Sequence, residues 1–336
     1  MCLIAQHGRD DTVDGVNILA LPKARNRFSR IFGLTWRAFR LALRQRADVY
    51  HFHDPELIPL GLLLKLRGMK VLYDVHEDVP RQILGKHWIR PWLRRPVAAL
   101  VEGVEWVAAR VFDAIVAATP TIAARFPSKK TITVQNFPML DELMKPESQP
   151  FSERPPHVAY IGGITETRGA KEMVRALEFV ENEHVRLQLG GNFTPKGLED
   201  EVRRLPGWSR VVAHGWVDRE TVANLLGGVR GGLVLFHPAP NHTHAQPNKL
   251  FEYMAAGLPV VASNFPLWRQ IVEGNHCGIC VDPLDPKAIA EAIEFLITHP
   301  EEARKMGENG RRAVETKYNW DSEAEKLLSL YKELLK

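Results

Sequence analysis

The sequence predicts an α/β protein made of two doubly wound domains that face a cleft. Short apolar runs alternate with helical patterns almost throughout, which indicates parallel sheets covered by helices on both faces. The length of 336 residues suits about two domains. A polar, proline-rich stretch at 145–156 separates two such patterns and indicates a linker outside the core. Ligands of open α/β sheets bind at the carboxyl ends of strands, so the cleft between the domains is the predicted active site.

The first pattern, residues 1–150, is the predicted N-terminal Rossmann-like domain. We expect helices at 29–46 and 97–111 between its strands. The expected strands are 2–5, 16–20, 48–52, 70–74, 113–117 and 131–135.

The second pattern, residues 151–315, is the predicted C-terminal Rossmann-like domain. The expected strands are 157–161, 185–189, 210–213, 232–236, 259–262 and 279–281. The expected helices between them are 169–180, 197–204, 219–226, 248–256 and 286–297.

Composition narrows the class of protein. With 45% hydrophobic and 25% charged residues, the chain has the composition of an ordinary globular protein with a sizeable core. Three cysteines are too few for a disulfide scaffold and favour a reducing compartment. The longest apolar run, 57–64, is too short to span a bilayer, and the first residues do not resemble a signal peptide. These features predict a cytoplasmic protein.

The first half of the chain is basic. Residues 1–150 contain 22 Lys and Arg against 15 Asp and Glu, whereas the rest contains 22 against 25. Basic residues mixed with Trp, Phe and Leu at 25–46 and 86–95 suit an anionic membrane surface, such as the inner membrane face. A solvated helix face explains them nearly as well, and no nucleic-acid-binding motif accompanies them. In the first segment they are Arg25, Arg27, Arg30, Arg37, Arg40, Arg44 and Arg46.

The most informative segment, 246–263, reads QPNKLFEYMAAGLPVVAS. Pro247 and Gly257 are placed to begin and end a helix. Asn248, Lys249 and Glu252 are three and four apart, so we expect them on one face near the helix start. The free N–H groups at the helix start and the ammonium group of Lys249 favour binding of a phosphate. The carboxylate of Glu252 can accept the hydrogen bonds of a ribose diol. An amphipathic helix with a surface ion pair is the alternative.

A second segment, 157–169, runs from a strand through two glycines into a helix. Gly162 and Gly163 allow a phosphate to approach the backbone, and Arg168 is placed to clamp a diphosphate. An ordinary tight turn also explains the glycine pair, but its position at the head of the second domain favours phosphate.

Together these segments resemble the retaining glycosyltransferases with the GT-B fold known as family 4, or glycosyl transferases group 1. The resemblance covers nearly the whole chain, with LGGN at 189–192, HGWV at 214–217 and YNW at 318–320 in the family's order. It implies sugar transfer from a nucleotide-diphosphate donor of UDP or GDP type, with retention and without a metal cofactor. It also implies that residues 316–336 form a helix crossing back to the N-terminal domain.

The resemblance assigns donor-binding roles to individual residues. Glu252 matches the glutamate that binds the ribose in the family, and Val217 lies in the loop beside the nucleobase. The family's other motif glutamate falls on His244, a departure that leaves the contact with the donor sugar open. Arg168 and Lys249 would stabilise charge on the leaving diphosphate.

Two histidine-rich segments follow strands in the first half, HFHDPE at 51–56 and YDVHED at 73–78. The resemblance places His76 on the donor sugar, and His53 with Asp54 on the acceptor or sugar side. A zinc or iron site is the alternative for such a pattern, but we favour sugar binding and predict no metal. For His51, hydrogen bonding at the strand ends is a further alternative.

The first half departs from the family in one respect. Its first predicted strand matches the family's second, so a central strand and the helix after it are missing. We therefore expect an incomplete first sheet, with a truncated or misassigned start as the hypothesis that explains it.

The resulting prediction is a glycosyltransferase that acts on a saccharide or lipid-linked saccharide acceptor in cell-surface polysaccharide or glycolipid assembly. A nucleotide-sugar epimerase of the same fold is one alternative, although the acid and base carboxylates it needs are not identified. A non-catalytic binding protein derived from the fold is the other.

Overall fold

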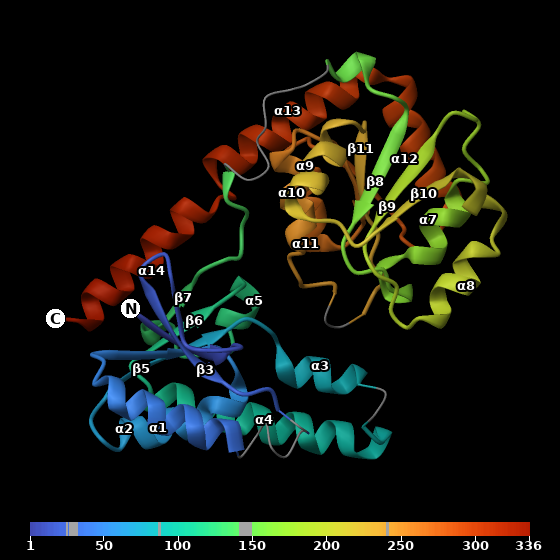
Figure 1. The fold of residues 1–336 in the computed structure, drawn as a ribbon. Coiled ribbons are helices and arrows are strands. Elements are labelled where there is room, and N and C mark those ends of the chain that lie inside the picture. Colours follow the sequence, from blue (N-terminus) through green and yellow to red (C-terminus); the bar gives the residue numbers. More distant parts are fainter. Residues whose placement is uncertain (25, 27–32, 87–88, 141–149, 240–241) are drawn as a thin grey trace. The chain divides into compact units, whose positions relative to one another are not determined.

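The computed structural model describes residues 1–24, 26, 33–86, 89–140, 150–239 and 242–336. These form two compact units (Figure 1). Unit 1 comprises Met1–Gln135 and Ala324–Lys336, and unit 2 comprises Asn136–Glu323. Unit 2 thus begins ahead of the boundary predicted at 150. Several predicted features lie outside the described residues, namely Arg25, Arg27, Arg30, the pair at 87–88 and the linker residues 145–149.

Unit 2 contains a six-stranded sheet in which every pair of neighbouring strands is parallel. The strand order is β10-β9-β8-β11-β12-β13, the order of a Rossmann fold. The chain therefore switches direction across the sheet between β8 and β11, and ligands of such sheets bind at the carboxyl ends of those two strands. The strands are β8 (His157–Ile161), β9 (Arg186–Gly190), β10 (Val211–Gly215), β11 (Gly231–Val234), β12 (Val260–Ser263) and β13 (Gly278–Val281).

Helices cover both faces of the unit 2 sheet, as predicted for a doubly wound domain. Figure 1 shows α9, α10 and α11 on one side and α7, α8 and α12 on the other. The helices are α7 (Ala170–Ala176), α8 (Gly197–Arg203), α9 (Arg219–Gly227), α10 (Asn248–Ala255), α11 (Pro266–Val272), α12 (Pro286–Thr298) and α13 (Pro300–Thr316). Tyr253 of α10 packs so closely on Gly232 of β11 that a Cβ there would overlap the ring. Its hydroxyl also accepts a hydrogen bond from the backbone N–H of Ile161 at 2.9 Å, which ties α10 to the end of β8.

Two residues of the predicted linker, Phe151 and Arg154, are buried, so the prediction of a solvated linker is wrong for them, whereas Ser152 and Glu153 are exposed. A 3-10 turn, η4 (Phe151–Glu153), places Phe151 in the core of unit 2. The buried Arg154 lies with its guanidinium 5.2 Å from the centre of that ring. An aromatic side chain and the apolar stem of an arginine bury well despite the surrounding prolines.

Unit 1 contains two separate sheets. The order β4-β5-β6-β7 forms a four-stranded parallel sheet from β4 (Val49–Phe52), β5 (Lys70–Val75), β6 (Ala114–Ala117) and β7 (Thr131–Thr133). The order β1-β3-β2 forms the other, from β1 (Cys2–Gln6), β2 (Asp11–Val13) and β3 (Val16–Leu21). Within the described residues, no strand joins β1 to β4.

Strand β2 was not predicted. It runs antiparallel to β3 and is joined to it by Asp14 and Gly15, which have φ values of 48° and 77°. An Asp-Gly pair with positive φ at both residues is the favoured two-residue hairpin turn, so the sequence does carry a signal for this strand.

The helices of unit 1 include the end of the chain. In Figure 1, α1, α2 and α4 lie together along one side of the four-stranded sheet. They are α1 (Thr35–Gln45), η2 (Pro55–Leu57), α2 (Ile58–Lys65), α3 (Val79–Gly85), α4 (Pro91–Val111), α5 (Pro120–Ala123) and η3 (Ser128–Lys130). The last helix, α14 (Trp320–Leu334), packs in unit 1 from Ala324 onward. No helix among the described residues combines the length and the apolar character needed to cross a bilayer.

Candidate functional site

Two glycines follow β8 at the point where the strand order of unit 2 switches direction. Gly162 has a φ of 132°, and a Cβ added to it would lie 3.0 Å from the Nζ of Lys249. A Cβ added to Gly163 would lie 2.8 Å from the Nη1 of Arg168. That guanidinium donates to the Gly163 carbonyl at 3.2 Å, as does the Tyr160 hydroxyl at 2.8 Å. The absence of side chains at these glycines is therefore what admits two cations to this end of the sheet.

The loop after β8 is held against the end of β11. Gly169 has a φ of 75°, and a Cβ on it would collide with the backbone carbonyl of Leu235. The backbone N–H of His237 donates to the Thr167 carbonyl at 2.9 Å. These contacts bring Arg168 within 5.4 Å of the Phe236 ring centre. The loop thus places a guanidinium where ligands of this fold bind.

Lys249 is a buried cation. Lys249 is 8% exposed, and its Nζ lies 3.7 Å from the centre of the Tyr160 ring. Within the described part of the chain, this Nζ has no hydrogen-bond partner. Burial, and next the nearby charge of Arg168, lower the pKa of Lys249 to about 7, while Glu252 acts in the opposite direction. A buried ammonium without a counter-ion is costly, so the site favours binding an anion.

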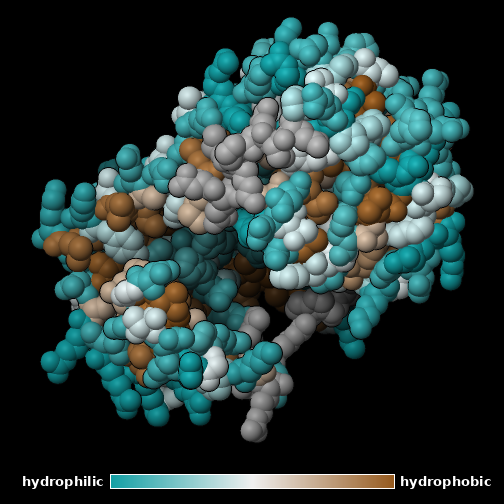
Figure 2. Space-filling model, turned by 45° about the horizontal axis from the view of Figure 1, so that its top comes forward, coloured by the Kyte–Doolittle hydropathy of each residue, from teal (hydrophilic) through white to brown (hydrophobic). Residues whose placement is uncertain are grey.

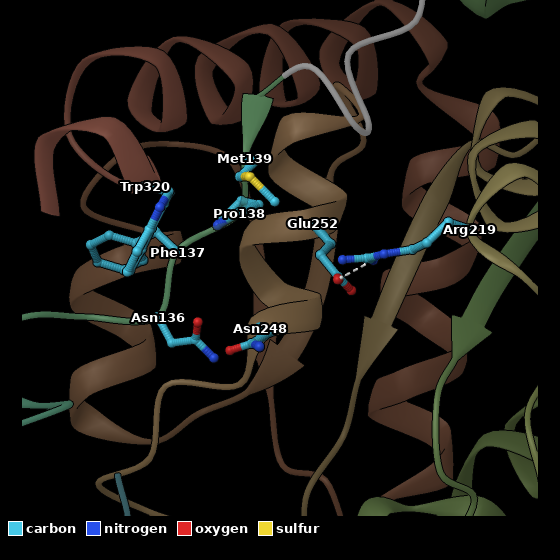
Figure 3. Close-up of a pocket in the computed structure, with 8 residues that line it drawn as sticks. All are labelled: Asn136, Phe137, Pro138, Met139, Arg219, Asn248, Glu252 and Trp320. Atoms are coloured by element: carbon cyan, nitrogen blue, oxygen red, sulfur yellow. Dashed lines mark hydrogen bonds and ion pairs between the residues drawn. The ribbon is translucent and has the colours of Figure 1, made fainter. Parts of the chain in front are cut away.

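A pocket of about 220 Å³ lies beside the outer face of α10 (Figure 3). Glu252 accepts a hydrogen bond from the Nη1 of Arg219 at 2.8 Å. Figure 3 shows the side chains of Asn248 and Asn136 pointing toward one another at the other end of the pocket. Polar donors and acceptors beside aromatic rings suit a nucleoside-sized ligand. The lining residues are Asn136, Phe137, Pro138, Met139, Arg219, Asn248, Glu252 and Trp320.

The predicted motif residues separate into two groups on α10. Asn248 and Glu252 are one turn apart and both line the pocket. Lys249 does not share their face, contrary to the prediction, because its side chain is buried toward Gly162 and Tyr160. The two groups still interact, since the charge of Glu252 raises the pKa of Lys249.

Two other predicted residues lie apart from the pocket lining. His244 is exposed in the turn before α10. Val217 packs beside Gly190 at the end of β9, where an added Cβ would lie 3.2 Å from its Cγ2. Val217 thus fixes the loop that leads to α9, two residues before Arg219.

Sequence reasoning missed most of the pocket. The sequence does carry a signal for Arg219, because it directly follows the helix-capping residue Asp218. Asp218 accepts a hydrogen bond from the backbone N–H of Thr221 at 2.8 Å at the start of α9. Trp320 donates its backbone N–H to the Pro138 carbonyl at 3.1 Å, which joins the segment at 136–139 to the start of α14. No local pattern identifies such a long-range contact.

The histidines of unit 1 gather around one carboxylate. Their distances to the Oδ2 of Asp74 are 3.1 Å from His51 Nε2, 3.3 Å from His53 Nδ1 and 3.4 Å from His76 Nε2. The structure thus brings His53 and His76 together but replaces the predicted neighbour Asp54 with Asp74. Asp54 is exposed at the start of η2.

The electrostatics of this cluster follow from its contacts. Burial raises the pKa of Asp74, but hydrogen bonds from the three histidines outweigh it and hold that pKa well below its usual range. The hydrogen bond to Asp74 raises the pKa of His76 above its ordinary value. On the other side of the cluster, His51 Nδ1 lies 2.6 Å from the hydroxyl of Tyr331 in α14.

Comparison with known proteins gives the family. The model described as "Glycosyl transferases group 1" matches residues 142–313, more than half of the chain, and the "Glycosyl transferase 4-like domain" matches 4–131. The MMP alpha-(1->4)-mannosyltransferase of Mycolicibacterium hassiacum is 25% identical over 312 residues, covering 89% of this chain and 74% of that protein. An uncharacterized glycosyltransferase of Methanocaldococcus jannaschii is 26% identical over 177 residues, 52% of this chain and 44% of that protein.

Solved structures share the fold. Sucrose-phosphate synthase from Thermosynechococcus elongatus matches with a TM-score of 0.77 at 19% identity, covering 99% of this chain and 88% of that chain. HepE of Anabaena, solved in complex with UDP, matches with a TM-score of 0.72 at 14% identity, covering 95% and 86%. These likenesses confirm the predicted GT-B fold. Fold and family agree, and the chain belongs to the glycosyl transferases group 1, with a family 4-like first half.

Proposed function

We propose that this glycosyltransferase transfers a sugar from a nucleotide-diphosphate sugar to an acceptor hydroxyl with retention of configuration. The observation that carries the proposal is the buried Lys249, whose Nζ lies beside Gly162 without a hydrogen-bond partner among the described residues. A donor diphosphate would supply the missing counter-ion. HepE, which has the same fold, is solved with UDP, UDP-glucose, and UDP with glucose, which favours a UDP-type donor here.

In this proposal the charge that builds on the leaving diphosphate is stabilised by Lys249 and Arg168. Preorganised cations in a water-poor site are worth more than the same charges in water, because the local dielectric constant is low. Asn248 and Glu252 would hold the nucleoside in the 220 Å³ pocket on the outer face of α10. The ribose diol would donate to the Glu252 carboxylate in competition with Arg219. The scheme requires no metal for departure of the diphosphate.

The sugar side of the reaction is proposed from the family resemblance. His76 would orient the donor sugar through Nδ1, because its Nε2 faces His53 and Asp74. His53, Asp54 and His244 complete the groups proposed to contact sugar. A relative is named as a mannosyltransferase, which supports a saccharide acceptor. A lipid-linked saccharide used in cell-surface polysaccharide assembly is the acceptor we propose.

Calorimetry and thermal shift test the donor site directly. UDP, GDP, ADP and their common sugar conjugates are titrated into the wild type and Glu252→Ala. We expect one base to be preferred and its binding to weaken by tenfold or more in the variant, since a charged hydrogen-bond partner is worth about 1.5–3 kcal/mol. Glu199→Ala is the matched control, because Glu199 also pairs with an arginine at 2.8 Å but on the surface of α8.

A transfer assay with the preferred donor and an added acceptor, run beside the titration, separates three conclusions. Release of sugar to an added acceptor, with the anomeric configuration read by NMR, supports retaining transfer. Interconversion of the donor sugar without transfer favours an epimerase. Failure of every nucleotide to bind a folded chain rejects the proposed donor site and favours a non-catalytic binding protein.

The surface of unit 1 favours a membrane partner as an additional proposal. Trp92, Leu100 and Trp106 of α4 are 69%, 67% and 53% exposed, and Arg94 and Arg95 lie among them. Hydrophobic residues also interrupt the hydrophilic surface at separate places on the face in Figure 2. Exposed Trp and Leu with arginines suit the interface of an anionic bilayer. Sedimentation with phosphatidylglycerol vesicles, but not phosphatidylcholine vesicles, should deplete the chain from solution, and Trp92→Ser should reduce that depletion.

A further inference from the structure

We propose that unit 1 binds one divalent transition-metal ion, of the zinc class, between His51, His53 and Asp74, with His76 beside them. Parallel strands β4 and β5 bring these residues together, because His51 pairs with Leu72 and Phe52 with Tyr73 in the register. The next residues, His53 and Asp74, then face the same end of the sheet, and His76 follows directly after the end of β5. The site is separate from the nucleotide pocket, which is built from residues of unit 2.

The distances from the histidine nitrogens to the Asp74 carboxylate match the edges of a tetrahedral metal site. Zinc binds histidine nitrogen and carboxylate oxygen at about 2.0–2.1 Å, so neighbouring ligand atoms of a tetrahedron lie about 3.3–3.4 Å apart. The three histidine nitrogens lie 3.1, 3.3 and 3.4 Å from the Oδ2 of Asp74. His53 Nδ1 and His76 Nε2 are 2.8 Å apart, a somewhat short edge. Three of the atoms, from His51, His53 and Asp74, lie within 4.8 Å of one another.

Hydrogen bonds alone do not satisfy all the polar atoms of this cluster. The 2.8 Å contact between His53 Nδ1 and His76 Nε2 needs a proton on one nitrogen and a lone pair on the other. Both nitrogens also face the Asp74 carboxylate, so with neutral rings one lone pair lies against a carboxylate oxygen. The second oxygen, Oδ1, is buried and has no hydrogen-bond partner among the described residues. A metal ion removes the conflict at Oδ2, because this oxygen and the histidine nitrogens that bind the ion then donate lone pairs to it.

The surroundings of the cluster suit a metal. His51 Nδ1 lies 2.6 Å from the Tyr331 hydroxyl, and metal-binding histidines characteristically donate their other N–H to such a partner. The side chains of His53 and His76 are 56% and 47% exposed, so an ion can enter, whereas that of Asp74 is 8% exposed. In unit 2, by contrast, the carboxylate of Glu172 contacts one histidine, His237, at 3.0 Å. This is a carboxylate–histidine pair and not a cluster of several histidines around one oxygen.

Metal binding by the full chain tests the proposal. The protein, without a histidine tag and after dialysis against a chelator, is titrated with Zn²⁺ by calorimetry and with Co²⁺ by visible absorption. We expect one ion per chain and the intense visible bands of tetrahedral Co²⁺. His53→Gln should weaken binding by at least about 100-fold and Tyr331→Phe by about tenfold, in line with the effects of lost outer partners. Asp74→Asn should behave like His53→Gln if it folds.

His237→Gln is the matched control, because it removes a histidine that contacts a carboxylate outside the cluster. It should leave the Zn²⁺ stoichiometry and affinity unchanged. Absence of a one-to-one site in the folded wild type, or equal affinity in wild type and His53→Gln, would overturn the proposal. Nucleotide binding measured on the same samples reports separately on unit 2, so failure of the metal site and failure of the donor site are distinguishable.

Discussion

Units 1 and 2 each gather charged side chains at the carboxyl ends of parallel strands, but with opposite signs. In unit 2, Lys249 and Arg168 stand beside a glycine loop, and the lysine has no hydrogen-bond partner among the described residues. In unit 1, Asp74 receives three histidines on one oxygen. The same fold therefore prepares one site for an anion and, in our proposal, another for a cation. The fold decides where ligands bind, and the side chains decide which charge they carry.

The two units also differ in how continuous their sheets are, although each contains closely packed glycines. The six strands of unit 2 form one continuous sheet, and Gly169, Gly232 and Gly278 each sit where a Cβ would collide with a neighbour. The strands of unit 1 form two sheets. A Cβ at Gly61 would collide there with the rings of Phe52 and Phe112, whereas a Cβ at Gly68 or Gly15 would meet nothing within 4 Å. Tight packing at the switch point holds the cations of unit 2 in place, so function and packing are linked there.

The largest expected effect comes from removing the buried cation. Lys249→Met should lower kcat by about 10²–10³, the range for loss of one preorganised group that stabilises transition-state charge. The same change should leave the melting temperature of the nucleotide-free protein equal or higher, since it replaces an uncompensated charge by an apolar side chain of similar size. Steady-state kinetics and a thermal melt measure both.

Lys287→Met, at an exposed position on α12, is the control for this change and should alter neither quantity. A Lys249→Met enzyme with wild-type kcat would show that the buried ammonium does not act on the diphosphate.

The next largest effect is a loss of stability, which we predict to differ between two glycines with nearly the same backbone conformation. Gly68 and Gly169 have φ values of 77° and 75°, but only at Gly169 does an added Cβ meet a backbone atom. Gly68→Ala should cost roughly 1–2 kcal/mol from the left-handed conformation. Gly169→Ala should cost roughly 1–3 kcal/mol more, because overpacking is added.

Hydrogen exchange by mass spectrometry reads the two units separately, with peptides from β5 for Gly68→Ala and from β11 for Gly169→Ala. Equal losses of protection would show that the loop after β8 can yield, contrary to the tight packing inferred for unit 2.

The smallest effect is a pH dependence that unit 2 should show. With a pKa of about 7, Lys249 carries its proton below neutral pH and loses it above. Affinity for a nucleotide-diphosphate sugar should therefore fall as pH rises through 7, by up to about tenfold per unit. The groups that act on this lysine are Arg168, Glu252 and the Tyr160 ring. In Lys249→Met, calorimetry from pH 6 to 9 should show this dependence removed.

The nucleotide-free protein should show the opposite trend in stability. The unfolded lysine has a pKa near 10.5, so between pH 7 and 10.5 the unfolded state binds more protons than the folded state. The contribution of Lys249 to the free energy of unfolding thus rises with pH over this range. The difference in the free energy of unfolding between wild type and Lys249→Met, measured by urea unfolding at several pH values, isolates this contribution. A difference that does not change with pH would contradict the lowered pKa of Lys249.

The sequence by itself determined the architecture and the segments that carry the proposed donor site. Apolar runs of strand length alternate with helical patterns, and all twelve predicted strands have counterparts among β1 and β3–β13. Pro247 and Gly257 do bound α10, and Gly257 has the expected left-handed φ of 69°. These features are local, because backbone preference and side-chain periodicity act over a few residues.

The tertiary structure alone decided which partners each residue has. It turned Lys249 away from Asn248 and Glu252, because the strand end at Tyr160 and Gly162 offers it a place inside the sheet. It chose Asp74 over Asp54 as the carboxylate of the histidine cluster, because parallel register aligns neighbouring strands and the sequence does not encode that register locally. It also added Asn136 and Trp320 to the pocket from distant segments. Such contacts depend on long-range packing, which no short pattern in a single sequence specifies.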